Sequence, residues 1–156
     1  MIEVNETIEV ASDPKTVWSL LSDPRAVVEC VSGATLGEQH EDGSYDAGIT
    51  VKFGPAKVAF RAKVEIEYDH PGMSGKVISR GKDNQGGARF HTTMAFKVQG
   101  REGDAAGSTI DIQAQVEISG RLASLIETGA SMVVKRMTKE FSEQLAARCA
   151  GVGTAH

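Results

Sequence analysis

The chain has 156 residues, of which 40% are hydrophobic and 24% are charged, and its formal net charge at pH 7 is −4. This composition is typical of a soluble globular protein and lacks the low hydrophobicity and high charge of disordered chains. An acidic chain has no basic field to attract phosphate backbones, so we expect no nucleic-acid partner.

The length fits one domain, which we place at residues 1–150, with residues 151–156 as a disordered tail of mainly small residues. The N-terminus lacks the basic and apolar regions of a signal peptide, and no run of 18 apolar residues follows it. We therefore expect a cytoplasmic protein. Its two cysteines, Cys30 and Cys149, lack metal-ligand spacing and are expected to be free buried thiols rather than a disulfide.

The N-terminal segment predicts a strand followed by two short helices. Residues 2–10 alternate between apolar and polar side chains, which is the period of a strand with one buried face. Asp13-Pro14 then supplies a capping residue and a first-turn proline for a helix that should end near Ser22. Asp23-Pro24 repeats this signal and predicts a second short helix that ends near Gly33.

Residues 34–119 predict an antiparallel meander of about six strands, because most segments alternate with period two between turn residues. We expect a hairpin turn at 41–44, a weaker strand around 76–80 and a long polar loop at 100–108. From Gly120 onward, apolar residues recur every three or four positions. This period predicts a helix of about 26 residues, which is long enough to cross the sheet.

The order of these elements predicts an α+β fold in which a curved antiparallel sheet wraps around a long C-terminal helix. Because consecutive hairpins alternate ends, the loops Gly54-Pro55 and Gln85-Gly86-Gly87 should share one end with the turn at Gly120, and Gly33 should lie there too. Alanines at 47, 62 and 114 on the buried register leave room for a ligand, or else mark a thin, tightly packed core. The residues alone leave both alternatives open.

The sequence contains no convincing catalytic or metal-binding motif. The glycine-rich turn at 84–87 joins two strands and opens no helix, so it lacks the N–H cluster of a phosphate loop. Arg136 and Glu140 are four residues apart, and either pair on the surface or anchor a polar ligand head group. Thr92, among apolar positions, marks either ligand contact or a satisfied core hydroxyl. We therefore expect no catalytic residue, no metal and no cofactor.

Several segments carry a resemblance to one family. The most specific is VKFGPAKVAFRAKVEI at residues 51–66. The others are Val17-Trp18 with Leu21 and Asp23-Pro24, the segment 30–33, Gln85-Gly86-Gly87, and QAQVEISGRLASL at 113–125 with Lys135 and Phe141. Together these segments span residues 2–145, and they resemble the CoxG-like family of CO dehydrogenase subunits within the START-like (SRPBCC) helix-grip superfamily.

The resemblance implies a seven-stranded antiparallel sheet around a long C-terminal helix, with an apolar cavity between them and two short helices closing the open end of the sheet. It also implies an accessory role beside a CO dehydrogenase-type molybdenum hydroxylase, through membrane recruitment or the handling of a quinone or similar lipid. Ser32 and Ala62 depart from the proline and glycine that are usual in the family. Some relatives continue into an apolar tail, whereas this chain ends at His156, so we expect transient contact with the inner face of a membrane.

Our main hypothesis is a non-enzymatic protein that binds a small apolar or amphipathic ligand, quinone-like or lipid-like, in an internal cavity. The alternative is a cyclase-, aromatase- or lyase-like enzyme that would use Arg136, Glu140 or Tyr68 as polar groups in that cavity. A third alternative is a protein with a filled core that only docks to an enzyme. The predicted ligand-binding residues are Phe53, Gly54, Pro55, Phe60, Gly86, Gly87, Phe90, Thr92, Met94, Leu125, Ile126, Gly129, Met132, Val133 and Arg136.

Overall fold

The computed structural model of the chain describes residues 2–53, 55–101 and 104–154. These residues form a seven-stranded antiparallel sheet with two short helices after the first strand and one long helix at the end. The strands are β1 (Ile2–Val10), β2 (Ala34–Gln39), β3 (Tyr45–Phe53), β4 (Ala56–Asp69), β5 (Ser74–Asp83), β6 (Arg89–Arg101) and β7 (Asp104–Ser119), and the helices are α1 (Pro14–Leu21), α2 (Pro24–Glu29) and α3 (Ala123–Thr154).

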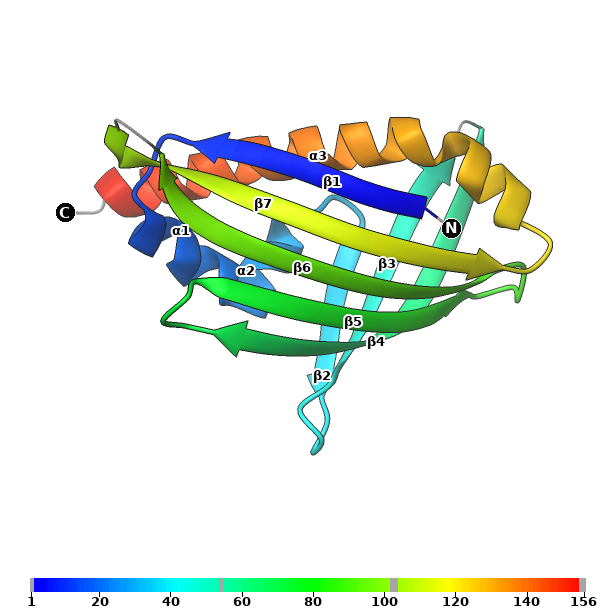
Figure 1. Ribbon diagram of the computed structural model, residues 1–156. Helices are drawn as coiled ribbons and strands as arrows, with labels where there is room; N and C mark the ends of the chain where they lie inside the picture. Colours follow the sequence, from blue (N-terminus) through cyan, green and yellow to red (C-terminus); the bar gives the residue numbers. More distant parts are fainter. Residues whose placement is uncertain (1, 54, 102–103, 155–156) are drawn as a thin grey trace.

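The strand order is β1-β7-β6-β5-β4-β3-β2, so the sheet is open and β1 and β2 are its edges. α3 packs against β1, β3 and β7, and α1 packs against α3. Figure 1 shows the sheet curving around α3, with α1, α2 and the β4–β5 turn at one end of the molecule and the β5–β6 turn and the β7–α3 connection at the other. This arrangement confirms the predicted fold class.

The two short helices begin where their capping residues predict. The Asp13 carboxylate accepts a hydrogen bond from the Thr16 backbone N–H at 3.4 Å, and Asp23 accepts one from the Arg25 N–H at 3.1 Å. A proline follows each aspartate, at the helical position where a missing N–H has no cost. α2 ends at Glu29, before the predicted end near Gly33, so it has only six residues.

Three boundaries differ from the sequence-based expectation. β5 spans ten residues instead of a weak central segment. The segment 100–108, expected as a polar loop, belongs mainly to β6 and β7, because Ser108 pairs with both Gly100 and Val10 and thus gains partners on two sides. α3 spans 32 residues, against about 26 expected, and it includes residues 151–154.

The turn at 85–87 and the connection at Gly120 lie together at one end of the sheet, as predicted. The Leu122 N–H donates to the Gly87 carbonyl at 2.9 Å, and Gly120 has φ +106 with only 2.8 Å between a would-be Cβ and that carbonyl oxygen. Gly33 lies beside β3, where its carbonyl accepts from the Thr50 N–H at 3.0 Å. Gly54 lies outside the described residues.

The core has two clusters, one at each end of the sheet. The first core cluster lies at the α1 end and consists of Ile8, Val10, Val17, Trp18, Leu21, Val98, Ile110, Leu145 and Cys149. The second core cluster lies under the first half of α3 and consists of Val51, Phe53, Val58, Phe60, Ala88, Ile126 and Val133. Both cysteines are buried and free, as predicted, and burial raises the pKa of each thiol.

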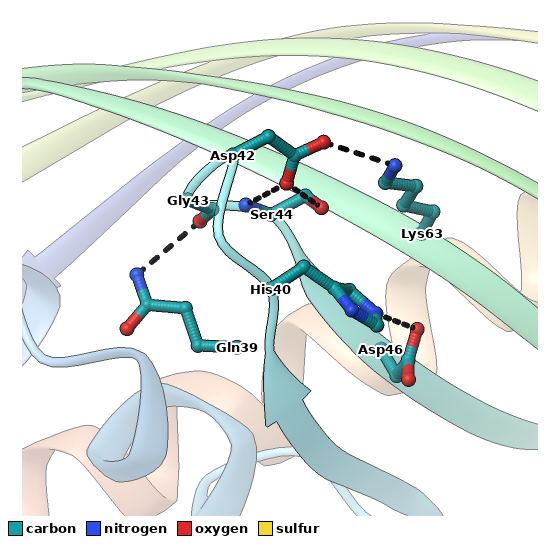
Figure 2. Close-up of polar contacts among 7 residues, drawn as sticks. All are labelled: Gln39, His40, Asp42, Gly43, Ser44, Asp46 and Lys63. Atoms are coloured by element: carbon teal, nitrogen blue, oxygen red, sulfur yellow. Dashed lines mark hydrogen bonds and ion pairs between the residues drawn. The ribbon is translucent and has the colours of Figure 1, made fainter.

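The β2–β3 hairpin is held by a polar network that Figure 2 shows. Asp42 accepts hydrogen bonds from the Ser44 N–H at 2.9 Å and from Lys63 Nζ of β4 at 3.1 Å, and His40 contacts Asp46 at 2.8 Å. Hydrogen bonds from Ser44, with the Lys63 ammonium, hold the pKa of Asp42 well below its usual range. The network ties the short edge strand β2 to the sheet through β3 and β4.

Candidate ligand cavity

An apolar cavity of about 260 Å³ lies between the helices and the inner face of the sheet. Its walls come from all three helices and from every strand except β1. The lining residues are Leu21, Pro24, Val27, Val28, Leu36, Ala47, Val64, Ile66, Tyr68, Val77, Met94, Phe96, Ile110, Ile112 and Phe141. Among these side chains only Tyr68 carries a hydrogen-bond donor, so the cavity is an almost purely apolar environment.

The cavity exists because α2 covers this part of the sheet with few side chains. Pro24, Val27 and Val28 lie on one face of this six-residue helix, at positions i, i+3 and i+4, and none of them is fully buried. The opposite wall carries the small side chain of Ala47 and the aliphatic side chains of β4. Because α2 is short and the Ala47 side chain is small, a volume remains between them that no side chain fills.

An aromatic group closes the cavity at the β4–β5 turn. Trp18 is 8% exposed, and its ring centroid lies 6.0 Å from that of Tyr68, 5.6 Å from that of His70 and 6.1 Å from that of Phe96. The Trp18 Nε1–H donates a hydrogen bond to His70 Nδ1 at 3.2 Å. This contact joins α1 to the turn that follows β4, and it fixes the end of the cavity.

Tyr68 is the one titratable residue of the cavity wall. Burial raises the pKa of its hydroxyl to about 12, with smaller contributions from Tyr45 and Asp23. Its phenol is therefore neutral at physiological pH and can donate a proton in a hydrogen bond. In the part of the chain that the structure describes, this hydroxyl has no hydrogen-bond partner.

The predicted ligand-binding residues divide into three groups. Met94 lines the cavity, and half-buried Thr92 precedes it on the same face of β6. A second group packs together in or against the second core cluster, and consists of Phe53, Phe60, Phe90, Ile126 and Val133. The third group lies toward the surface: Leu125 is 39% exposed, Met132 is 79% exposed, and Pro55, Gly86 and Arg136 are also exposed.

The second core cluster leaves little space around the predicted residues. The rings of Phe60 and Phe90 meet edge to face at 5.3 Å. A Cβ at Gly129 would lie 3.3 Å from Phe53 Cδ1, so this glycine lets α3 approach β3 closely. Buried Gly87 packs in the same way against Leu122. A ligand role for this group stays a prediction.

Sequence reasoning missed most of the cavity wall, although partial signals for it exist. The spacing of Pro24, Val27 and Val28 gives α2 one apolar face, and this face must pack against another element of the fold. Ala47, recognised as a small inward residue, does line the cavity. The missing information was the position of α2 along the strands.

Larger hollows, of about 570 and 580 Å³, lie on the outer face of the sheet. Charged side chains such as Glu67, Lys76, Asp111 and Arg61 contribute to their lining, so neither hollow is a purely apolar cavity. Within the described residues, no group of three histidine, cysteine or carboxylate side chains could hold a metal ion. Over the same residues, no helix has the length and apolarity needed to span a membrane.

Comparison with known families settles the relationship of the chain. The model of the CoxG family, described as a carbon monoxide dehydrogenase subunit, matches residues 7–150. The chain belongs to this CoxG family. A comparison with curated protein sequences gives no match.

Solved structures similar to this CoxG-family chain share its fold at low sequence identity. A conserved protein from Geobacillus kaustophilus is 20% identical with a TM-score of 0.82, and the alignment covers 96% of each chain. The Zhui aromatase/cyclase from Streptomyces sp. R1128 is 12% identical with a TM-score of 0.68, over 99% of this chain and 96% of that one. A START superfamily protein from Mycobacterium smegmatis is 17% identical with a TM-score of 0.59, over 96% and 98%. The CoxG-family chain thus has the START-like helix-grip fold.

Proposed function

We propose that this CoxG-family protein binds a small apolar or amphipathic molecule in the cavity beneath α2. The observation that carries this proposal is the wall itself, in which fourteen of the fifteen lining side chains lack a hydrogen-bond donor. Removing apolar ligand surface from water contributes roughly 25 cal/mol per Å² before ordering costs are subtracted. The ligand therefore gains affinity from burial, with the Tyr68 hydroxyl as the one donor near it.

The volume sets the size of the part that enters. An apolar cavity of about 150 Å³ accepts a single benzene ring, and this cavity of about 260 Å³ is larger. It fits a fused pair of rings or a short branched chain, while a longer lipid would leave part of its length outside. A quinone-like or lipid-like ligand, as expected from the sequence, meets this requirement. The presence of the cavity counts against the alternative of a filled core.

The family match supports a proposal for the wider role. The family description names carbon monoxide dehydrogenase, and we infer that the chain serves as an accessory to a CO dehydrogenase-type molybdenum hydroxylase. In that role it would carry its ligand in the cytoplasm and make transient contact with the inner face of the membrane.

The experiment is native mass spectrometry of freshly purified protein, followed by extraction and identification of any bound molecule. Recovery of an apolar molecule near one per chain would support the proposal. Protein that emerges empty is then titrated with 2-methyl-1,4-naphthoquinone, and saturable binding is expected. The proposal is contradicted if no apolar molecule co-purifies with the protein and the empty protein also does not bind the naphthoquinone.

Two variants, each with one alanine replaced by leucine, test the location of the site. Ala47→Leu adds volume inside the cavity and should abolish or strongly weaken binding. Ala59→Leu makes the same change on the neighbouring strand, beside the outer hollow, and should leave binding unchanged. Equal binding by both variants would place the ligand elsewhere.

An enzyme remains the second candidate, because one structural neighbour is an aromatase/cyclase and Tyr68 could donate a proton to a carbonyl group. The cavity wall offers this one titratable side chain and no base to act with it. Tyr68→Phe separates the two functions. Turnover of a polyketide-like ketone that is lost in this variant would establish the enzyme, whereas a carrier keeps most of its affinity for the naphthoquinone.

A further inference from the structure

A second cleft, separate from the apolar cavity, lies where α3 passes the edge of β3. Its volume is about 510 Å³, and it shares no lining residue with the cavity. The lining residues are Ser32, Gly33, Thr50, Val51, Lys52, Lys57, Arg136, Met137 and Glu140. The lining thus includes three cationic residues and one carboxylate, although the whole chain has a net charge of −4.

The two lysines occupy an unfavourable position relative to each other. Lys52 and Lys57 are direct partners in the β3–β4 register, and both are exposed. Like charges directly opposite on paired strands destabilise a sheet. Across the residues that the structure describes, neither ammonium group has an ion-pair partner. An anion between them would remove this repulsion.

Arg136 reaches the same cleft from α3. The pairing of β2 with β3 ends at Ala34 and Ile49. Beyond this pair, the Gly33 carbonyl accepts one more hydrogen bond, from the Thr50 N–H. The Lys52 carbonyl lies beyond that point, and Arg136 donates a hydrogen bond to it at 3.1 Å. This bond uses one of the five N–H donors of the guanidinium group and holds its planar fork in the cleft. The Ser32 hydroxyl is a further donor in the lining.

We propose that this cleft binds a phosphate group through Lys52, Lys57 and Arg136. A planar guanidinium recognises the paired oxygens of a phosphate, and two ammonium groups add charge without fixing direction. Glu140 is the single opposing charge and reduces the affinity. The site is independent of the proposed ligand carriage, and the phosphate belongs either to a soluble molecule or to a lipid head group.

Inorganic phosphate is the first probe. Its binding to the intact protein is measured by NMR, from changes in amide and side-chain chemical shifts. Saturable shifts at the three cations are expected for the wild type. Lys57→Gln should weaken binding about fivefold, as expected for one cation near a phosphate, and a Lys52→Gln, Lys57→Gln double variant should weaken it further. Glu140→Gln should strengthen binding. Lys76→Gln, an exposed lysine on β5, is the matched control and should have no effect.

Vesicles distinguish the two sources of phosphate. Met132 is 79% exposed and lies one helical turn before Arg136 on α3, so it would touch a membrane to which the cleft docks. A lipid source predicts binding to phosphatidylglycerol vesicles, weakened by both Lys57→Gln and Met132→Gln. A soluble source predicts phosphate binding that Met132→Gln leaves unchanged, with no vesicle binding. If the protein binds neither inorganic phosphate nor the vesicles, or if the lysine double variant binds as well as the wild type, the proposed site is wrong.

Discussion

The two ends of the sheet's inner face are built on the same strands but differ in what covers them. In the second core cluster, Phe53 and Phe60 of neighbouring strands meet Ile126 of α3, and the glycine at 129 brings the helix close. At the other end, the six-residue α2 covers Ala47 and Val64, and about 260 Å³ remains empty. The covering element, more than the strand sequence, decides which end can hold a ligand.

The largest expected effect comes from the packed end. Phe60→Ala removes a ring that is 8% exposed and contacts Phe90 edge to face. We expect the free energy of unfolding to fall by about 3–5 kcal/mol, because the buried ring is lost and the surrounding core relaxes only partially. Urea unfolding followed by circular dichroism measures this loss. A loss below about 1 kcal/mol would mean that this end is not tightly packed.

A matched pair on one strand sharpens the comparison. Val58 and Val64 face the same side of β4, but Val58 belongs to the second core cluster and Val64 lines the cavity. Val58→Ala should cost about 1.6 kcal/mol, the value of two buried methyl groups, and more if a cavity remains. Val64→Ala should cost less than half of that, because Val64 is half-buried beside an existing space. Equal losses in urea unfolding would contradict the proposed difference.

The pH dependence of stability tests the environment of Tyr68. An unfolded tyrosine has a pKa near 10, whereas the pKa of Tyr68 in the folded chain is about 12. Between these values the unfolded chain loses this proton first, so the free energy of unfolding falls as pH rises from about 10 to 12. The slope should be a fraction of 1.4 kcal/mol per pH unit, since Tyr68 is only half-buried. Tyr68→Phe should flatten it relative to wild type, and an unchanged slope would argue against burial.

The smallest effect is expected at the β2–β3 hairpin, which carries the cavity-lining Leu36 and Ala47 on its strands. Asp42→Asn removes a carboxylate whose pKa is depressed by Ser44 and Lys63. Stability above about pH 4 should fall slightly, and the difference from wild type should shrink at lower pH as the wild-type carboxyl becomes protonated. Thermal unfolding at several pH values measures this. A loss comparable to that of Phe60→Ala would show that the hairpin controls the whole sheet.

Much of the fold could be predicted from local signals. Alternation in β1 and β4 indicated the strands, and Asp13 and Asp23 indicated the helix starts, because both depend on neighbouring residues only. The helix length was harder, since the glycines after Ala150 do not end α3.

The site was less predictable, as β6 illustrates. Phe90 and Met94 share one face of this strand, but Phe90 packs against the second core cluster and Met94 lines the cavity. Side-chain parity tells which face is buried. It does not tell where along the strand a helix leaves the sheet uncovered, because that depends on the packing of α1 against β6, β7 and α3, which are distant from it in sequence.

The aromatic closure of the cavity also makes the protein its own optical sensor. Trp18 is the one tryptophan in the chain, and it packs against Tyr68 and Phe96, both of which line the cavity. Its indole N–H bonds to His70 at the outer end. Indole emission responds to the polarity and packing around the ring, so filling or emptying the cavity should change the intrinsic fluorescence. Ligand exchange can then be followed in real time without attaching a dye.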